Sequence, residues 1–455
     1  MIGGNGKKSF NIHIMKIIFK GDARVIKFLG KQNNNSNLQF RPSIFTISQP
    51  VDNGILLFNT LTCSLLLLSS TEYRNMLNMQ VLRDAWFIVP MEFDDYQLSC
   101  QIKNLISMTR VHRHSIIGYT ILTTTDCNAR CFYCYEKGVE KKTMTIETAD
   151  LLSDYITKNY NKHKVSLSWF GGEPLFNIKV IDRITQNLER NGVEFGSTMV
   201  TNGYLFSPGI VGRAASLWHL RNVQITIDGT ENIYNRTKAF IYEGINAYHR
   251  VMSNIKLLLD HQFEVSIRIN VDVHNADDVL NLIHNIKSDF DGYQNLSVYS
   301  HALFETSTSG TAEHRRKVYI KRKEISREIK ALGLDHPYNL PNKLPEHLCM
   351  ADDDESVDVS PDGKLGKCEH YVDRGFYGSL QCDIIDRNAL NRFSEVVHDK
   401  PECHQCFYHP HCKILKLCCQ NECTPEQVDE HLNDFKDSMV NAYRIFLEKN
   451  NDDKN

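Results

Sequence analysis

Three cysteines, Cys127, Cys131 and Cys134, follow one another with the spacing C-x3-C-x2-C in the segment TTTDCNARCFYCYEKG. Three thiolates on one short loop can hold three corners of an iron–sulfur cluster, because such clusters normally take cysteine ligands. The fourth iron then stays open for a ligand from outside the protein. A structural zinc site is the alternative, but such sites prefer four ligands in C-x2-C pairs, and no fourth ligand lies nearby in the sequence. The spacing therefore favours a cluster with an open, reactive iron.

The segment WFGGEPLF is a second candidate for chemistry. Gly171 and Gly172 allow a ligand to approach the backbone closely, and Glu173 could accept a hydrogen bond from an ammonium group. This loop and the three-cysteine loop each come directly after an expected strand. In parallel α/β folds, ligand chemistry gathers at the carboxyl ends of the strands. Both loops therefore fall where such a fold places its site.

A second group of cysteines occupies the C-terminal region. Its nine members are Cys349, Cys368, Cys382, Cys403, Cys406, Cys412, Cys418, Cys419 and Cys423. Nine thiols are too many for one tetrahedral site, and two zinc sites of four cysteines each would use eight of them. The segment VSPDGKLGKC predicts a hairpin that would direct Cys368 back toward another ligand. Spacing alone leaves zinc and iron–sulfur clusters equally open here.

The elements that must position these loops alternate between strand and helix. Strands are expected at Ile116–Thr123, Val165–Phe170, Ser197–Thr201, Val223–Ile227, Glu264–Val271 and Leu296–His301, with helical periodicity at 146–160, 178–188 and 247–259 between them. Six strands that alternate with helices imply right-handed βαβ units and a parallel sheet. Periodicity does not decide whether the sheet is open or curls into a partial barrel.

The first motifs together resemble the radical SAM enzyme superfamily. In that family a C-x3-C-x-(aromatic)-C loop binds a [4Fe–4S] cluster whose open iron chelates S-adenosyl-L-methionine, and a 5′-deoxyadenosyl radical is released. The resemblance implies a partial (β/α)6 TIM-like barrel and makes Cys127, Cys131 and Cys134 the catalytic cluster ligands. The cofactor contacts that it implies are Tyr133, Gly171, Gly172, Glu173, Pro174, Asn202, Thr226, Arg236 and Lys238. Relatives carry an arginine about twelve residues after the position of Thr226. Here that position is Lys238, so the carboxylate-binding cation is either Lys238 or Arg236.

The C-terminal cysteines resemble the SPASM extension of radical SAM enzymes, which holds two auxiliary [4Fe–4S] clusters. The resemblance assigns Cys403, Cys406, Cys412 and Cys423 to an outer cluster. It assigns Cys349, Cys368 and either Cys418 or Cys419 to an inner cluster, with Cys382 as a possible fourth ligand. One family cysteine would fall at Lys416, so the last assignments depart from the family pattern.

Four segments are expected: residues 1–112, 113–305, 306–345 and 346–455. The first is a small α+β module with strands near Asn11–Phe19 and Gly54–Asn59. It is similar to the winged-helix-like module with which peptide maturases bind the leader of a precursor peptide. Such binding often adds a strand to a free sheet edge. The second is the radical SAM core. The third is a basic, solvated connecting helix, and the fourth is the SPASM region, which ends in a helix over Pro425–Lys449.

Composition excludes several classes of partner. The 455 residues carry 52 basic and 55 acidic side chains, a net charge of −3, which offers no general footprint for nucleic acid or a membrane. The most apolar stretch, Ile55–Leu68, is short and broken by polar residues, whereas a membrane helix needs about 20 apolar residues. The N-terminus lacks the features of a signal peptide. We therefore expect a cytoplasmic protein with reduced thiols, among which Cys63 is a core residue.

These features lead to one expected function and two alternatives. The resemblance implies a radical SAM oxidoreductase that modifies a ribosomally synthesised precursor peptide (a RiPP maturase), with thioether or other crosslink formation. An electron donor such as flavodoxin or ferredoxin would be its second partner. A maturase of the anaerobic sulfatase type, which forms formylglycine, is an alternative. A zinc-stabilised, non-catalytic peptide-binding protein is an alternative of another class.

Overall fold

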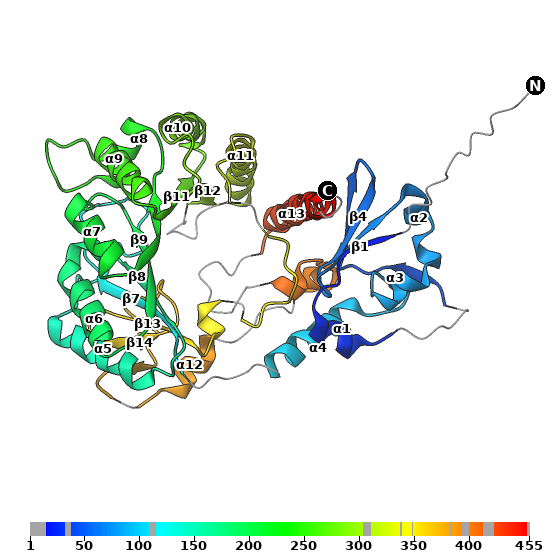
Figure 1. The fold of residues 1–455 in the computed structure, drawn as a ribbon, viewed down its shortest axis with the longest axis horizontal. Coiled ribbons are helices and arrows are strands. Elements are labelled where there is room, and N and C mark those ends of the chain that lie inside the picture. The colour runs from blue at the N-terminus through cyan, green and yellow to red at the C-terminus, as the bar shows by residue number, and fades with distance from the viewer. Residues whose placement is uncertain are drawn as a thin grey trace, which may run out of the picture.

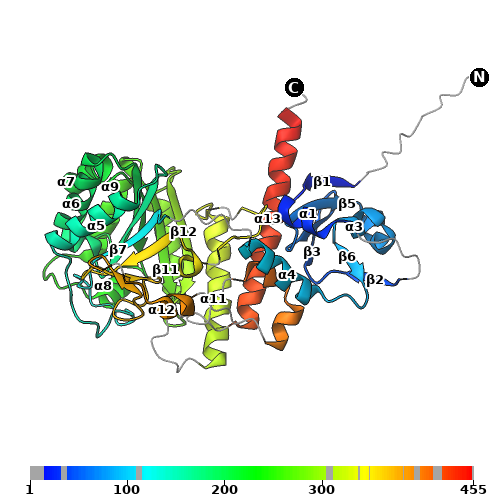
Figure 2. The same cartoon turned by 90° about the horizontal axis from the view of Figure 1, so that it is seen from below.

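The structure is a computed structural model that describes residues 15–31, 38–108, 115–303, 311–336, 339–347, 349–382, 384–393, 400–412 and 423–452. Cys418 and Cys419 lie outside these residues. Figure 1 shows a large curved sheet with helices on its outer face at one end of the molecule and a smaller sheet at the other. The C-terminal helix α13 lies beside the smaller sheet in both views (Figures 1 and 2).

The large sheet has nine strands in the order β12-β11-β10-β9-β8-β7-β13-β14-β15. Its first six strands pair in parallel: β7 (Gly118–Thr124), β8 (Val165–Gly171), β9 (Phe195–Thr201), β10 (Leu220–Thr226), β11 (Glu264–Val271) and β12 (Leu296–Ala302). All six strands predicted from the sequence are therefore present. Their pairing in chain order confirms the predicted α/β fold, with each carboxyl end at the same edge of the sheet.

The helices that connect these strands cover one face of the sheet. They are α5 (Ile146–Asn159), α6 (Ile178–Arg190), α7 (Pro208–Ser216), α8 (Glu231–Lys238), α9 (Ala247–Asp260) and α10 (Ala276–Asp289). Strand residues that point toward them, such as Trp169 and Ile267, are fully buried. Because successive strand residues point to opposite faces, the other face carries Gln224, Arg268 and Tyr299, which stay partly exposed. The concave face of the curved sheet is thus polar.

The basic helix α11 (Ala312–Ala331) is more than a solvated connector. Its apolar stripe of Val318, Ile325 and Ile329 is buried beside β12, and only its remaining faces are in solvent. The charge run concealed this stripe, because apolar residues are few in it but fall on one side of the helix.

The Cys-rich region begins as an extension of the large sheet. Strand β13 (Ser356–Val359) pairs in parallel with β7, and β14 (Lys364–Gly366) returns beside β13 through the Pro-Asp-Gly turn, as the hairpin signal predicted. Strand β15 (Gly378–Ser379) and helix α12 (Arg387–Phe393) follow. The hairpin therefore carries Cys368 on the same sheet that carries the three-cysteine loop.

The N-terminal module contains a four-stranded antiparallel sheet in the order β1-β5-β4-β3. Its strands are β1 (Lys16–Phe19), β3 (Thr46–Val51), β4 (Gly54–Asn59) and β5 (Ser64–Leu68), and a second pair is formed by β2 (Phe40–Pro42) and β6 (Ile88–Pro90). Its helices are α1 (Ala23–Leu29), α2 (Ser70–Arg74), α3 (Gln80–Asp84) and α4 (Asp95–Met108). Strands β1 and β3 form the edges of the four-stranded sheet among the described residues.

The apolar stretch Ile55–Leu68 is the hairpin β4–β5, buried on both faces. Leu56 and Phe58 face one hydrophobic cluster and Leu57 faces another, which explains why the apolar run is continuous rather than alternating. Cys63 in the turn is fully buried, as predicted. Within the described residues, no helix has both the length and the apolar character that crossing a bilayer requires.

Helix α13 (Pro425–Asp452) completes the core of the N-terminal module. Its residues Phe435, Met439 and Tyr443 are buried in the cluster that contains Phe58, and the rings of Phe58 and Phe435 stack with centroids 5.4 Å apart. On its other side, α13 receives Arg322 of α11, whose Nη2 lies 2.7 Å from Oε1 of Glu430. The C-terminal helix therefore joins the module to the core.

Candidate cluster and cofactor site

The first cysteine of the three-cysteine loop, Cys127, comes three residues after the end of β7, at the carboxyl edge of the parallel strands. Burial raises the pKa of the Cys127 thiol to about 12 and that of Cys134 to about 11; charge repulsion from Cys131 contributes to both, and Cys134 also raises the pKa of Cys127. The three sulfurs therefore lie close enough to interact. Thiols with such pKa values ionise only against a compensating cation, and a coordinating metal provides that cation. The donor set fits an iron–sulfur cluster.

The glycines of the GGEP loop allow it to pack closely against the backbone that leads into the cysteine loop. A Cβ on Gly171 would come within 2.2 Å of the carbonyl oxygen of Thr124, and one on Gly172 within 2.4 Å of that of Asp126. Gly171 also has a φ of +111°, which favours glycine. The nitrogen of Gly172 donates to Thr124 O at 2.9 Å. These glycines therefore let the backbone at the start of the cysteine loop approach closely, and their contact with the cofactor stays a prediction.

Glu173 links the GGEP loop to the next strand end. Its Oε1 accepts from Thr201 Oγ1 at 2.7 Å and from Leu175 N at 3.1 Å, and its Oε2 accepts from Asn202 N at 2.8 Å. The side chain is fully buried, and burial raises its pKa to about 7. A carboxylate has about four acceptor positions, so Glu173 retains capacity for an ammonium donor. Pro174, beside it, is the first residue of a short 3-10 turn.

Asn202, in the loop after β9, reaches the first thiol. Its Nδ2 lies 3.7 Å from Cys127 Sγ and donates to Asn128 Oδ1 at 2.7 Å. Thr226 is the last residue of β10 and is half-buried at the same edge of the sheet. The buried Asn128 Nδ2 has no hydrogen-bond partner among the described residues. An orphaned donor beside a thiol is a further sign that this edge accommodates a polar group.

The two candidate cations are placed differently. Lys238 is buried, and its Nζ lies 2.9 Å from Asp228 Oδ2 and donates to the Tyr133 hydroxyl at 2.8 Å. Its burial would lower its pKa, but the charge of Asp228 more than offsets this and raises the pKa well above its usual value. Arg236 lies on the exposed side of α8. The structure thus brings Lys238, but not Arg236, to the cysteine loop.

Asp228 and Asn270 are the site residues that sequence reasoning passed over. Asp228 accepts a hydrogen bond from the Tyr133 hydroxyl, and Asn270 Nδ2 lies 3.3 Å from the same hydroxyl. The available signal was that both residues stand at the carboxyl end of a strand in the sheet that carries the thiols.

The C-terminal cysteines form two described groups. Cys349 lies close enough to Cys368 that its thiolate would raise the pKa of the Cys368 thiol, while Cys382 is exposed just after β15. A second interacting group contains Cys403, Cys406, Cys412 and Cys423. Within the parts of the chain that are described, no set of three or more His, Cys, Asp or Glu side chains has the spacing that holds a single metal ion.

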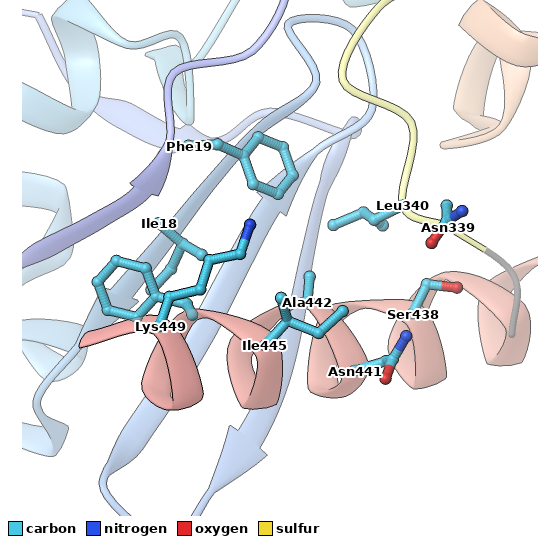
Figure 3. A pocket seen from close by; sticks show the side chains of 10 residues that line it. Ile18, Phe19, Asn339, Leu340, Ser438, Asn441, Ala442, Ile445 and Lys449 are labelled. Carbon is cyan, nitrogen blue, oxygen red and sulfur yellow. The ribbon is translucent and has the colours of Figure 1, made fainter. Parts of the chain in front are cut away.

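The N-terminal module carries a pocket of about 270 Å³ where the edge strand β1 meets α13 (Figure 3). Ile18 and Phe19 of β1 line one side and Ala442 and Ile445 of α13 line the other, with Lys449 at one end. The pocket is therefore mainly apolar and lies alongside a strand at the edge of its sheet.

The fold is that of an α/β protein, and the three-thiol loop at the carboxyl ends of its parallel strands, packed against a Gly-Gly-Glu-Pro loop, fits an iron–sulfur cluster. Residues 121–286 match the family model of the Radical SAM superfamily, so the chain contains a radical SAM domain. Proteins of this family bind S-adenosylmethionine and a [4Fe–4S] cluster.

Two curated relatives match part of the chain. An uncharacterized protein of Methanocaldococcus jannaschii is 31% identical over 112 residues, which are 24% of this chain and 37% of that protein. The radical SAM cyclopropyl synthase TigE of Paramaledivibacter caminithermalis is 24% identical over 161 residues, which are 31% of this chain and 32% of that protein. The chain thus spans about a third of the length of these relatives.

The comparison with solved structures shows a similar fold in anSMEcpe. The structure of anSMEcpe with bound AdoMet, an anaerobic sulfatase maturase, has a TM-score of 0.55 at 17% identity and covers 73% of this chain and 95% of that one. SuiB of Streptococcus suis bound to its precursor peptide SuiA has a TM-score of 0.47 at 12% identity and covers 83% of this chain and 94% of that one.

Proposed function

We propose that this radical SAM protein modifies a ribosomally synthesised precursor peptide. The observation that carries the proposal is the N-terminal module, in which a sheet edge at β1 and an apolar pocket lie side by side. A peptide can add to such an edge by main-chain hydrogen bonds while one of its apolar side chains fills the pocket. The structure of anSMEcpe with the Cp18Cys peptide, at a TM-score of 0.54, is an example of this fold with a peptide bound.

We assign a separate role in the radical site to each of its residues. Cys127, Cys131 and Cys134 would hold the [4Fe–4S] cluster, and Lys238, rather than Arg236, would supply the cation for the carboxylate of S-adenosylmethionine. Asn202 would orient the cysteine loop through Asn128, Glu173 would receive the ammonium group of the cofactor, and Thr226 would contribute a hydroxyl. When bound, cluster and cofactor supply a 5′-deoxyadenosyl radical. The polar concave face of the sheet, with Arg268, would receive the substrate segment.

The Cys-rich region is proposed to be a SPASM extension with two auxiliary [4Fe–4S] clusters. Cys403, Cys406, Cys412 and Cys423 would hold the outer one, in keeping with their mutual proximity. Cys349 and Cys368 would belong to the inner one, with Cys382 and either Cys418 or Cys419. An oxidative crosslink such as a thioether removes two electrons from the peptide: the 5′-deoxyadenosyl radical would take one as a hydrogen atom, and the auxiliary clusters would accept the other. A flavodoxin or ferredoxin would supply the separate electron that reduces the cluster held by Cys127, Cys131 and Cys134.

The test is anaerobic incubation of the reconstituted protein with S-adenosylmethionine, a reductant and a short peptide encoded beside its gene. A change in peptide mass together with 5′-deoxyadenosine supports the proposal, and unchanged peptide mass despite 5′-deoxyadenosine release overturns the choice of substrate. Metal analysis comes first: three four-iron clusters imply about twelve irons per chain. Two zincs and no iron would instead support a zinc-stabilised binding protein.

A second candidate is a formylglycine-forming maturase, which the fold of anSMEcpe favours. Incubation with a sulfatase-derived peptide that contains cysteine distinguishes it, because formylglycine formation from cysteine removes the thiol, whereas a crosslink removes two hydrogens.

A further inference from the structure

The segment from Cys403 to Cys412, which contains three of the four proposed outer-cluster thiols, is held by the N-terminal module. Thr60, in the turn between β4 and β5, donates from Oγ1 to the carbonyl oxygen of Phe407 at 2.6 Å, and its own carbonyl oxygen lies 2.7 Å from Nε2 of His411. His411 is buried, with 6% of its surface exposed, and its ring also contacts Cys63 Sγ at 3.8 Å. The backbone between Cys406 and Cys412 is thus fastened to a turn more than 340 residues earlier in the chain.

Helix α4 of the same module makes a second set of contacts. Ser99 Oγ lies 2.8 Å from Nδ1 of His409, which has 2% of its surface exposed. The ring of Tyr96 stacks on His404, with centroids 4.0 Å apart and an interplanar angle of 11°. These histidines are therefore engaged by the module, and one face of α4 follows the thiol segment from His404 to Cys412.

Lys103 continues this face of α4 and is the cation that the module brings to the thiols. Its Nζ donates to the carbonyl oxygens of His409 at 3.3 Å and of Cys412 at 3.5 Å. Burial lowers the pKa of Lys103, while the neighbouring thiols of Cys412, Cys100 and Cys403 favour its charged form. Asp352 also faces this lysine, and Lys400 and Glu402 lie near Cys423. Lys103 differs from Lys400 because it comes from a different part of the fold and is fixed by two carbonyl groups.

We propose that Lys103 is a positioning residue of the outer cluster site and raises the reduction potential of the cluster held there. The proposal rests on the assignment of Cys403, Cys406, Cys412 and Cys423 to one auxiliary cluster. Four thiolates make that site anionic, so an added electron is stabilised by a nearby cation. Charge and hydrogen bonds around a cluster are established determinants of its potential. The N-terminal module would then make the outer cluster a better electron acceptor, through Lys103, in addition to binding the peptide.

The experiment compares Lys103→Gln, which keeps a neutral hydrogen-bond donor, with Lys103→Arg, which keeps the charge. Each reconstituted full-length variant is titrated with dithionite and followed by electron paramagnetic resonance. In Lys103→Gln the ratio of reduced to oxidised outer cluster at a fixed potential is expected to be at least tenfold lower than in wild type. This corresponds to a midpoint potential that is at least about 59 mV lower for a one-electron couple. Lys103→Arg is expected to keep the wild-type potential. Lys27→Gln, an exposed lysine of α1, is the matched control.

Loss of about four irons in Lys103→Gln but not in Lys103→Arg would also support the positioning role. Full iron content and an unchanged potential in Lys103→Gln would overturn the proposal. Hydrogen exchange on the wild-type chain gives a test that needs no variant: reconstitution should slow amide exchange in α4 together with residues 400–412. Protection of 400–412 without any change in α4 would also count against it.

These outcomes differ from failure of the proposed function. If the wild-type chain bound no auxiliary iron, the outer cluster itself would be disproved. If the chain bound all its iron but its potential did not change in Lys103→Gln, only the role of this lysine would be disproved.

Discussion

Nζ of Lys238 lies 2.9 Å from Oδ2 of Asp228, and 4% and 1% of the two side chains are exposed. The hydroxyl of Tyr133, one residue before Cys134, contacts both partners. This buried ion pair joins α8 and the end of β10 to the cysteine loop, so that the cation proposed to face the cofactor is held by the same residues that order the thiols.

Replacing Lys238 by Met should destabilise the metal-free protein by about 3–5 kcal/mol, because Asp228 would be left as an uncompensated buried charge. Denaturant unfolding measures this loss. The double variant Lys238→Met/Asp228→Asn should recover much of it, since the charge is then gone. Arg236→Met, on the exposed side of α8, should stay within about 0.5 kcal/mol of wild type. Equal losses for Lys238→Met and Arg236→Met would contradict the burial difference.

Replacing Gly172 by Ala should displace the cysteine loop while leaving the fold intact. The added Cβ would meet the carbonyl oxygen of Asp126 at 2.4 Å, and the neighbouring backbone must move to relieve that contact. We expect about four irons fewer per chain after reconstitution, with an unchanged far-ultraviolet circular dichroism spectrum. Gly209→Ala on α7 is the matched control, because its Cβ would meet nothing within 4 Å. Full iron content in Gly172→Ala would show that the loop tolerates the shift.

The buried carboxyl of Glu173 should make the stability of the metal-free protein depend on pH. Its pKa is raised from 4.5 to about 7, so between these values the unfolded chain loses the proton while the folded chain keeps it. The free energy of unfolding therefore falls as pH rises through this window, by up to about 3 kcal/mol for this group. Below pH 4.5 both the folded and the unfolded chain hold the proton, so this carboxyl does not lower the free energy of unfolding there.

Glu173→Gln should flatten that dependence, measured by urea unfolding at intervals between pH 4.5 and 7.5. Glu136→Gln provides a comparison, because burial raises the pKa of Glu136 to about 8 and its effect should extend to higher pH. Parallel curves for wild type and Glu173→Gln would mean that this carboxyl is ionised in the folded state throughout.

Replacing Phe435 by Ala should destabilise the N-terminal module, although the residue lies in the last helix of the chain. A buried Phe→Ala change costs about 3–5 kcal/mol, and Phe435 has 2% of its surface exposed and stacks on Phe58 of β4. Hydrogen exchange should then show faster opening of β4 and β5. Val440→Ala, on the exposed side of the same helix, should leave these strands protected. Equal protection in both variants would contradict the shared core.

The strands of the core and the three-cysteine loop could be predicted from sequence because local signals carry them: β-branched runs, helical periodicity and a fixed thiol spacing. The pairing of β13 with β7 could not, because it joins Ser356 to Gly118 and no local pattern encodes a partner so distant. For the same reason the ion pair of Lys238 with Asp228 and the contact of Phe435 with Phe58 emerged only from the fold. The GGEP glycines were recognised, but spacing does not tell which backbone approaches them.

The path of the C-terminal region has a consequence for building hybrid proteins. Its first strand is hydrogen-bonded into the large sheet, and its last helix closes the small one at the opposite end of the molecule (Figure 2). The first hundred residues are therefore not an interchangeable cassette. A chimera that borrows a peptide-recognition module from another protein would have to borrow a matching tail as well, and natural recombination at residue 112 alone would leave both parts with an unfilled interior.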